Sequence, residues 1–120
     1  MQQPLQITFK EMKHSDAIEA RVREYAAKLE KFYEPIVHCH VVIEAPDRHS
    51  NHGGLYRIHL DVTVPGDEIA VSHQGPKNHA HEDVYVALRD AFRAARRQLQ
   101  DSLQKKRGKV KRHAPPGSND

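Results

Sequence analysis

Tryptophan is absent from this sequence of 120 residues, and cysteine occurs once, at Cys39. A single cysteine excludes an intrachain disulfide, and a lone thiol is typical of a reducing compartment. No apolar run approaches the length of a membrane span, and the start, MQQPLQITF, lacks the features of a secretory signal. We therefore expect a cytoplasmic chain without membrane contact, built on a single hydrophobic core.

Motifs of enzyme active sites are also missing. The sequence contains no GxSxG nucleophile motif, no P-loop and no GxGxxG fingerprint. Cys39 falls on the predicted buried face of a strand, where a thiol behaves as a small apolar group. His59 and Asp61 resemble an acid–base pair, but the flat, solvated sheet face on which we place them is expected to offer no pocket. These observations argue against an enzyme and against a small-molecule substrate.

Histidine, in contrast, is abundant, with ten residues in the chain. His38 and His40 share one strand face, and His59 on the next strand is near enough in principle to complete a zinc site with them. Neither HExxH nor paired CxxC motifs accompany these residues, and spacing alone is weak evidence. We therefore predict neither a metal nor another cofactor. Four further histidines fall in predicted loops: His49, His52, His79 and His81.

Four segments alternate apolar and polar residues, which predicts strands with one buried face. They cover residues 4–11, 36–45, 56–64 and 69–72. A tight turn at 65–67 joins the last two, and turn-forming residues at 46–54 and 74–80 predict loops. We expect the last three strands to form an antiparallel meander. The first strand should run parallel to the second after a right-handed helical crossover.

Two segments repeat apolar residues at spacings of three and four, which predicts helices with one buried stripe. The first begins at Ser15, whose hydroxyl suits the N-cap, and ends near Tyr33 because a proline follows. The second covers residues 82–107, with acidic residues at its start, and Gly108 is expected to end it. The predicted fold is α+β, of order β-α-β-β-β-α, with both helices on one face of a four-stranded sheet.

Positive charge is concentrated at the end of the chain and on one side of the last helix. Residues 105–112 contain six of the 19 basic residues, and we expect residues 108–120 to form a basic tail without fixed structure. The last helix carries an arginine stripe with few acids at helical pairing distance, which favours contact with a polyanion over a merely solvated face. Four aromatic residues fall at core or core-edge positions, so the sequence favours backbone contacts over base stacking: Tyr25, Phe32, Tyr85 and Phe92.

The order of elements, the segment KLEKFYEPI at 28–36, a strand ending in VPG and the closing helix EDVYVALRDAFRAARRQL together resemble a known family. This family is the ribosome hibernation-promoting factors, also called ribosome-associated translation inhibitors or sigma-54 modulation proteins. The resemblance covers about residues 4–107. It implies that the domain at 1–107 binds rRNA and ribosomal proteins of the small ribosomal subunit in the mRNA and tRNA channel. Translation would thereby be blocked without catalysis in stress or stationary phase.

The resemblance also implies which residues contact rRNA. The KLEK lysines and the basic positions of the closing helix match those of the family: Lys28, Lys31, Arg89, Arg93, Arg96 and Arg97. The flank of the first helix and the end of the last helix add further candidates: Arg21, Lys105, Lys106 and Arg107. The chain resembles the short form, without a C-terminal dimerisation domain, and we expect a monomer away from the ribosome. Two alternatives remain open, a regulatory protein-binding module of the sigma-factor modulator type and a general duplex-RNA-binding domain.

Overall fold

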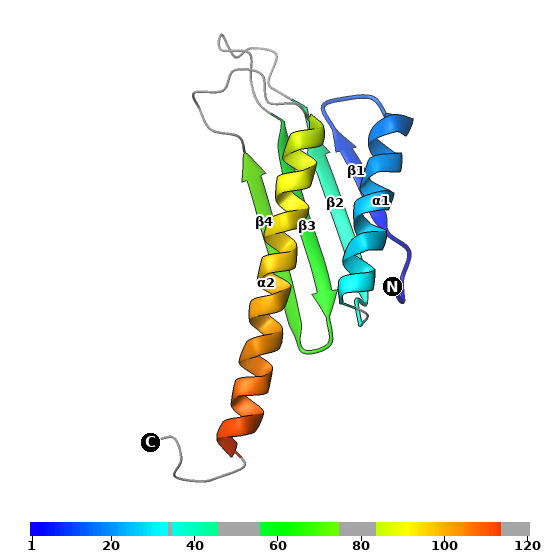
Figure 1. The fold of residues 1–120 in the computed structure, drawn as a ribbon. Coiled ribbons are helices and arrows are strands. Elements are labelled where there is room, and N and C mark those ends of the chain that lie inside the picture. Colours follow the sequence, from blue (N-terminus) through cyan, green and yellow to red (C-terminus); the bar gives the residue numbers. More distant parts are fainter. Residues whose placement is uncertain (34, 46–55, 75–83, 114–120) are drawn as a thin grey trace.

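The computed structural model describes residues 1–33, 35–45, 56–74 and 84–113 (Figure 1). Its elements are β1 (Gln6–Lys10), α1 (Asp16–Phe32), β2 (His38–Glu44), β3 (Arg57–Val64), β4 (Asp67–Gln74) and α2 (Val84–His113). This order confirms the predicted α+β fold. The predicted loop at 46–54, most of the one at 74–80, the acidic start of the last helix and residues 114–120 lie outside the described residues, as do the four loop histidines.

The four strands form one sheet in the order β1-β2-β3-β4. β1 runs parallel to β2, whereas β2, β3 and β4 form the predicted antiparallel meander. Pro65 and Gly66 alone separate β3 from β4, and β4 is longer than the sequence predicted because Val64 already pairs with Asp67 across this turn. Gly66 has a φ of 80°, a left-handed conformation that is favourable for a residue without Cβ.

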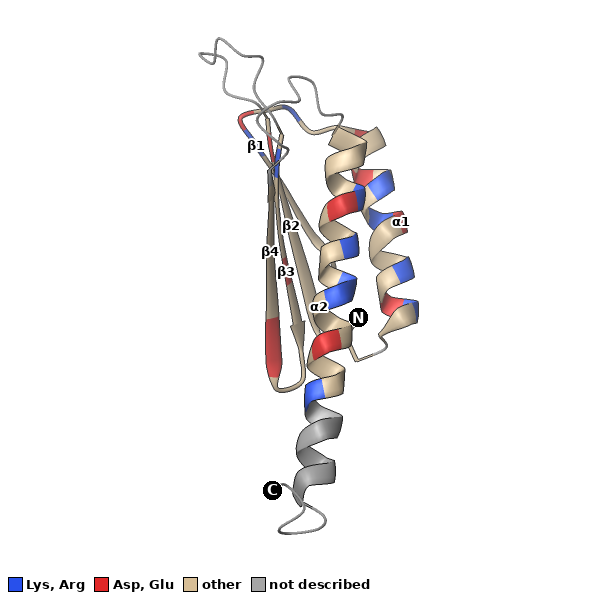
Figure 2. Ribbon diagram, turned by 60° about the vertical axis from the view of Figure 1, so that its left-hand side comes forward, with Lys and Arg blue, Asp and Glu red and all other residues tan. Residues whose placement is uncertain are grey.

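Both helices lie on the same face of the sheet, and the core fills the space between the two layers (Figure 2). Alternate residues of the strands point into this core, as Cys39, Val41 and Ile43 of β2 do. On α2, three fully buried alanines allow the helix to lie close to the strands: Ala87, Ala91 and Ala95. Neither helix has an apolar stretch of the length needed to cross a membrane, over the residues that the structure describes.

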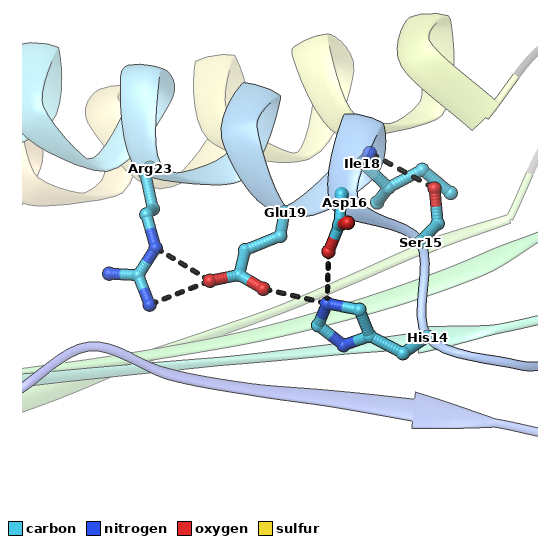
Figure 3. A network of polar contacts seen from close by, with 6 residues as sticks. All are labelled: His14, Ser15, Asp16, Ile18, Glu19 and Arg23. Carbon is cyan, nitrogen blue, oxygen red and sulfur yellow. Dashed lines mark hydrogen bonds and ion pairs between the residues drawn. The ribbon is translucent and has the colours of Figure 1, made fainter.

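The start of α1 is fixed by the predicted cap. Ser15 Oγ accepts a 3.2 Å hydrogen bond from the backbone N–H of Ile18, which satisfies one of the free amides of the first turn (Figure 3). The acidic side chains of Asp16 and Glu19 lie in this turn, where the positive end of the helix dipole favours them. His14 Nε2 contacts both carboxylates, at 3.0 and 2.9 Å respectively.

The end of α2 corrects the sequence prediction. Gly108 was expected to end this helix, but α2 continues to His113 and projects past the β3–β4 turn (Figure 1). A glycine within a helix costs only about 1 kcal/mol relative to alanine. Lysine and arginine, which favour helix, flank Gly108 on both sides in the segment KKRGKVKR, so the glycine alone does not stop the helix.

Candidate nucleic-acid interface

Most of the predicted contact residues lie on the outer side of the helical layer. Figure 2 shows basic residues along both helices, with the sheet seen nearly edge-on beside them. Lys28, Lys31, Arg89, Arg93, Arg96 and Arg97 are exposed, whereas Arg21 is half-buried. We call these seven residues the basic surface. The structure therefore brings together residues of two helices that are separated in the sequence by three strands.

The buried stripe of α2 determines where its arginines point. Leu88 and Leu99 are fully buried against the sheet. At about 100° per residue, Arg93 falls roughly 120° or more from both leucines and therefore points away from the strands. The same periodicity places Arg89, Arg96 and Arg97 beside it. Because α2 buries its apolar stripe against the sheet, it has to expose the arginine stripe on its opposite side.

The two helices meet along a seam in which basic side chains rest on aromatic rings. The guanidinium carbon of Arg21 on α1 lies 4.9 Å from the ring centre of Tyr85 on α2. At the other end of the seam the roles are reversed, because Arg96 on α2 lies 4.3 Å from the ring centre of Phe32 on α1. Such contacts orient guanidinium groups at a surface and contribute about 0.5–1 kcal/mol each when exposed.

Two aromatic rings pack against each other at the centre of the seam. The ring centres of Tyr25 and Phe92 are 5.5 Å apart, and Phe92 is only 5% exposed. Lys28 Nζ lies 6.0 Å from the ring centre of Tyr25. The prediction of core or core-edge positions is confirmed for Phe92 and for the half-buried Tyr25. It is wrong for Phe32, which lies at the edge of the apolar stripe of α1 and is 37% exposed.

Few carboxylates oppose the charge of the basic surface. Arg89 Nε contacts Asp90 Oδ1 at 3.2 Å. The sequence did not predict this pairing of adjacent residues, because acids were expected to pair only from three or four positions away. Arg21 Nε lies 3.7 Å from Glu24 Oε1. Exposed pairs of this kind are worth about 0–1 kcal/mol and compete weakly with a phosphate. In the described part of the chain, no carboxylate lies within 4.0 Å of the basic groups of Arg93, Arg96 or Arg97.

Of the three candidates at 105–107, the structure describes the side chain of Lys105 alone. Lys105 is exposed on α2, but nine residues after Arg96 it is turned about 180° from it around the helix axis. The side chains of Lys106 and Arg107 lie outside the described residues. The described contact residues that lie together are therefore those of α1 and of the first four turns of α2.

The open face of the sheet carries a hollow that the sequence did not predict. Its volume is about 570 Å³. It is lined by Lys10, Val42, Glu44, Arg57, Ile58, His59, Ser72 and His73. The expectation that this face would be flat and without a pocket is therefore not met at this place. In the hollow, His59 Nδ1 lies 2.9 Å from Ser72 Oγ, and its Nε2 lies 3.1 Å from Asp61 Oδ1.

The three histidines considered for a zinc site do not form one. Register places His40 opposite Asp61 and His59 opposite Val42, and His40 Nε2 is hydrogen-bonded to Thr8 Oγ1 at 2.9 Å. Among the described residues, potential ligand atoms do come within 4.8 Å of one another in His14, Asp16 and Glu19 (Figure 3). The hydrogen bond between His14 and Asp16 and the contact between His14 Nε2 and Glu19 Oε1 account for that proximity.

Cys39 occupies the buried position that the strand pattern predicted. Burial, with a smaller effect of the Asp61 charge, raises the pKa of its thiol from an ordinary 9.0 to about 12. The thiolate is the nucleophilic form of cysteine, and this environment suppresses it. Cys39 therefore acts as a core residue.

The comparison with known families covers the helices and strands described above. The family model described as Sigma 54 modulation protein / S30EA ribosomal protein matches residues 5–107. The chain belongs to this family. The matched range begins just before β1 and includes the whole basic surface on α1 and α2, so the family match and the candidate interface coincide. No protein with curated annotation matches the sequence.

Two solved structures have the fold of this member of the S30EA family. The N-terminal domain of Protein Y from Thermus thermophilus superposes with a TM-score of 0.62 at 20% sequence identity, covering 80% of this chain and 93% of that one. A ribosomal subunit interface protein from Coxiella burnetii gives a TM-score of 0.66 at 15% identity, covering 83% of this chain and 97% of that one. At these identities the likeness concerns the fold.

Proposed function

We propose that the chain binds rRNA of the small ribosomal subunit through the basic surface, occupies the mRNA and tRNA channel, and so blocks translation in stress or stationary phase. The observation that carries the proposal is the row formed by Arg93, Arg96 and Arg97. These residues are exposed opposite the core, with no described carboxylate within 4.0 Å of their basic groups. The proposal is supported by family membership and by a structural relative described as a ribosomal subunit interface protein.

The chemistry of this function is occupancy rather than catalysis. A guanidinium presents a flat fork of N–H donors that matches the oxygens of a phosphate, and arginine remains charged at physiological pH. Each phosphate that the surface neutralises releases counterions, which makes binding favourable at low salt and weaker as salt rises. Because α1 and α2 both pack on the sheet, the chain presents these groups as one preformed surface.

Co-sedimentation with purified ribosomes tests the proposal. A variant with Arg89, Arg93, Arg96 and Arg97 changed to glutamate should stay at the top of the gradient, whereas the wild type should travel with the small subunit. A matched control changes four basic residues away from the basic surface to glutamate and should bind like the wild type: Lys10, Lys13, Arg23 and Arg57. Because both variants change the net charge equally, a difference in their ribosome binding reports where on the surface the contacts lie.

The salt dependence of the same binding separates the alternatives. For phosphate contacts, the logarithm of the affinity should fall by about 0.7–0.9 per tenfold increase in salt for each contact made. A flat dependence would contradict rRNA binding and favour a protein partner. Equal affinity for isolated duplex RNA and for ribosomes would instead favour a general duplex-RNA-binding domain. Failure of the wild type to sediment with ribosomes would refute the proposal.

A further inference from the structure

Phe32 stands out from the other large apolar side chains that the structure describes. It is 37% exposed, whereas Leu29 before it and Tyr33 after it are 4% and 7% exposed. It is the last residue of α1, at one end of the seam. Single exposed apolar residues are common on protein surfaces, so exposure alone does not indicate a site.

The distinguishing feature of Phe32 is its partner. The guanidinium carbon of Arg96 lies 4.3 Å from the ring centre, and this contact restricts an otherwise flexible side chain to one place on the surface. Within the described residues, no carboxylate lies within 4.0 Å of the Arg96 guanidinium. The pair therefore combines an aromatic ring and a planar cation, both open to solvent, with N–H donors still free of an acidic partner.

The other aromatic contacts of the seam lack this combination. At the opposite end, Arg21 and Tyr85 are both half-buried, and Arg21 also lies 3.7 Å from Glu24. In the centre, Phe92 is only 5% exposed beneath Tyr25. Of these three contacts, the one formed by Phe32 and Arg96 is thus the one that a flat ligand can reach without displacing a neighbour.

Basic groups flank this pair on both helices. Lys28 lies four residues before Phe32 on α1, and Arg93 lies three residues before Arg96 on α2. Residues three and four apart share one side of a helix, so these two cations lie on the same side as the pair they flank. Because α1 and α2 run parallel, both cations lie about one helical turn before the pair, where they can bind the phosphate backbone next to a base that rests on it.

We propose that Phe32 and Arg96 form a stacking site for one unpaired nucleobase, with Lys28 and Arg93 binding the phosphate backbone next to it. The inference rests on the proposed function and adds to it a preference for single-stranded RNA, which phosphate contacts alone do not provide. Bases stack on aromatic rings and on guanidinium planes, and every base offers a face for this. The sequence disfavoured stacking because its aromatic residues fall at core or core-edge positions, but the structure exposes Phe32 at one end of the seam.

Fluorescence anisotropy with a short, unstructured single-stranded RNA and with its duplex tests the site. Phe32→Leu should weaken binding of the single strand roughly five- to 100-fold, because stacking is lost. It should leave duplex binding and the salt dependence unchanged. Phe32→Tyr keeps an aromatic ring and should bind like the wild type. As a control, Arg97→Gln should weaken both RNAs and lower the salt slope by about 0.7–0.9.

A second measurement does not depend on a loss of binding. The chain contains no tryptophan, so Phe32→Trp introduces a single indole whose emission reports this site alone. Bound single-stranded RNA should quench that emission, and bound duplex should not. Phe9→Trp, on the strand β1 and outside the basic surface, serves as a control and should be insensitive to both RNAs.

The outcomes separate the stacking site from the proposed function. If Phe32→Leu binds the single strand as tightly as the wild type while Arg97→Gln binds weakly, the stacking site is refuted and the basic surface stands. Unquenched emission of Phe32→Trp with RNA bound would refute it in the same way. If the wild type binds neither RNA nor ribosomes, the stacking site and the proposed function fail together.

Discussion

The hydroxyl of Ser102 on α2 donates a 2.6 Å hydrogen bond to Oδ2 of Asp67, the first residue of β4. Ser102 is 8% exposed, and the other carboxylate oxygen of Asp67 accepts a 2.8 Å bond from the backbone N–H of Glu68. Asp67 thus connects the last helix to the turn between β3 and β4. The bond fixes the position of α2, and with it the arginines, along the length of the sheet.

Ser102→Ala should lower the free energy of unfolding by about 1–2 kcal/mol, because it removes a partly buried hydrogen bond to a charged group. Urea unfolding followed by circular dichroism measures this change. Gln100→Ala, an exposed neighbour on the same helix, should change stability by less than about 0.5 kcal/mol. Equal stability of the two variants would show that the bond does not hold the helix.

Ala91→Leu should destabilise the chain by about 1–3 kcal/mol, because Ala91 is fully buried where α2 packs on the strands. A larger side chain there has to push the helix away from the sheet. Ala27→Leu is the matched control, since Ala27 is exposed on α1 and has room for the added atoms. The urea midpoints of both variants check the prediction, and an unchanged midpoint for Ala91→Leu would contradict the close helix–sheet packing.

The stability of the chain should fall at high pH, in part through Cys39. The pKa of this thiol is about 12 in the folded chain and near 9.0 when exposed, so between these values the unfolded chain binds fewer protons. The free energy of unfolding therefore decreases as pH rises through this window, by at most about 1.4 kcal/mol per pH unit from this group. Below about pH 9 the contribution is constant.

Cys39→Val isolates the thiol from other groups that titrate at high pH. Valine is close to cysteine in size and does not ionise, so the variant should lose less stability than the wild type between pH 9 and 11. Urea unfolding at a series of pH values provides the comparison. Identical slopes for the two proteins would mean that Cys39 remains un-ionised after unfolding or ionises equally well when folded.

Periodic patterns predicted the parts of this molecule that depend on local sequence. Alternation in β2 places Cys39, Val41 and Ile43 inside, because a strand can bury only every second residue. The arginines of α2 were predictable for the same reason, since a helix that buries Leu88 and Leu99 exposes the opposite side. Both predictions require only the residue pattern of a single element and the assumption that one of its faces is buried.

Contacts between distant elements were not predictable in this way. The bond between Ser102 and Asp67 joins residues 35 positions apart, and its existence depends on how far α2 slides along the sheet. The register that places His59 opposite Val42 rather than His40 depends on the long connection between β2 and β3. Gly108 was misjudged for a different reason, because the helix preference of a single residue is weaker than that of its neighbours.

The seam between the helices has equal spacing on its two sides. Eleven positions separate Arg21 from Phe32 on α1, and eleven separate Tyr85 from Arg96 on α2, so the two helices advance together (Figure 1). Eleven residues are three helical turns, or about 16 Å. This equal spacing makes the seam depend on the number of residues in each helix more than on their type. Deleting one residue between Tyr85 and Arg96 would turn everything after it by about 100° and separate Arg96 from Phe32. Related chains should therefore tolerate substitutions along this seam far better than insertions or deletions in either helix.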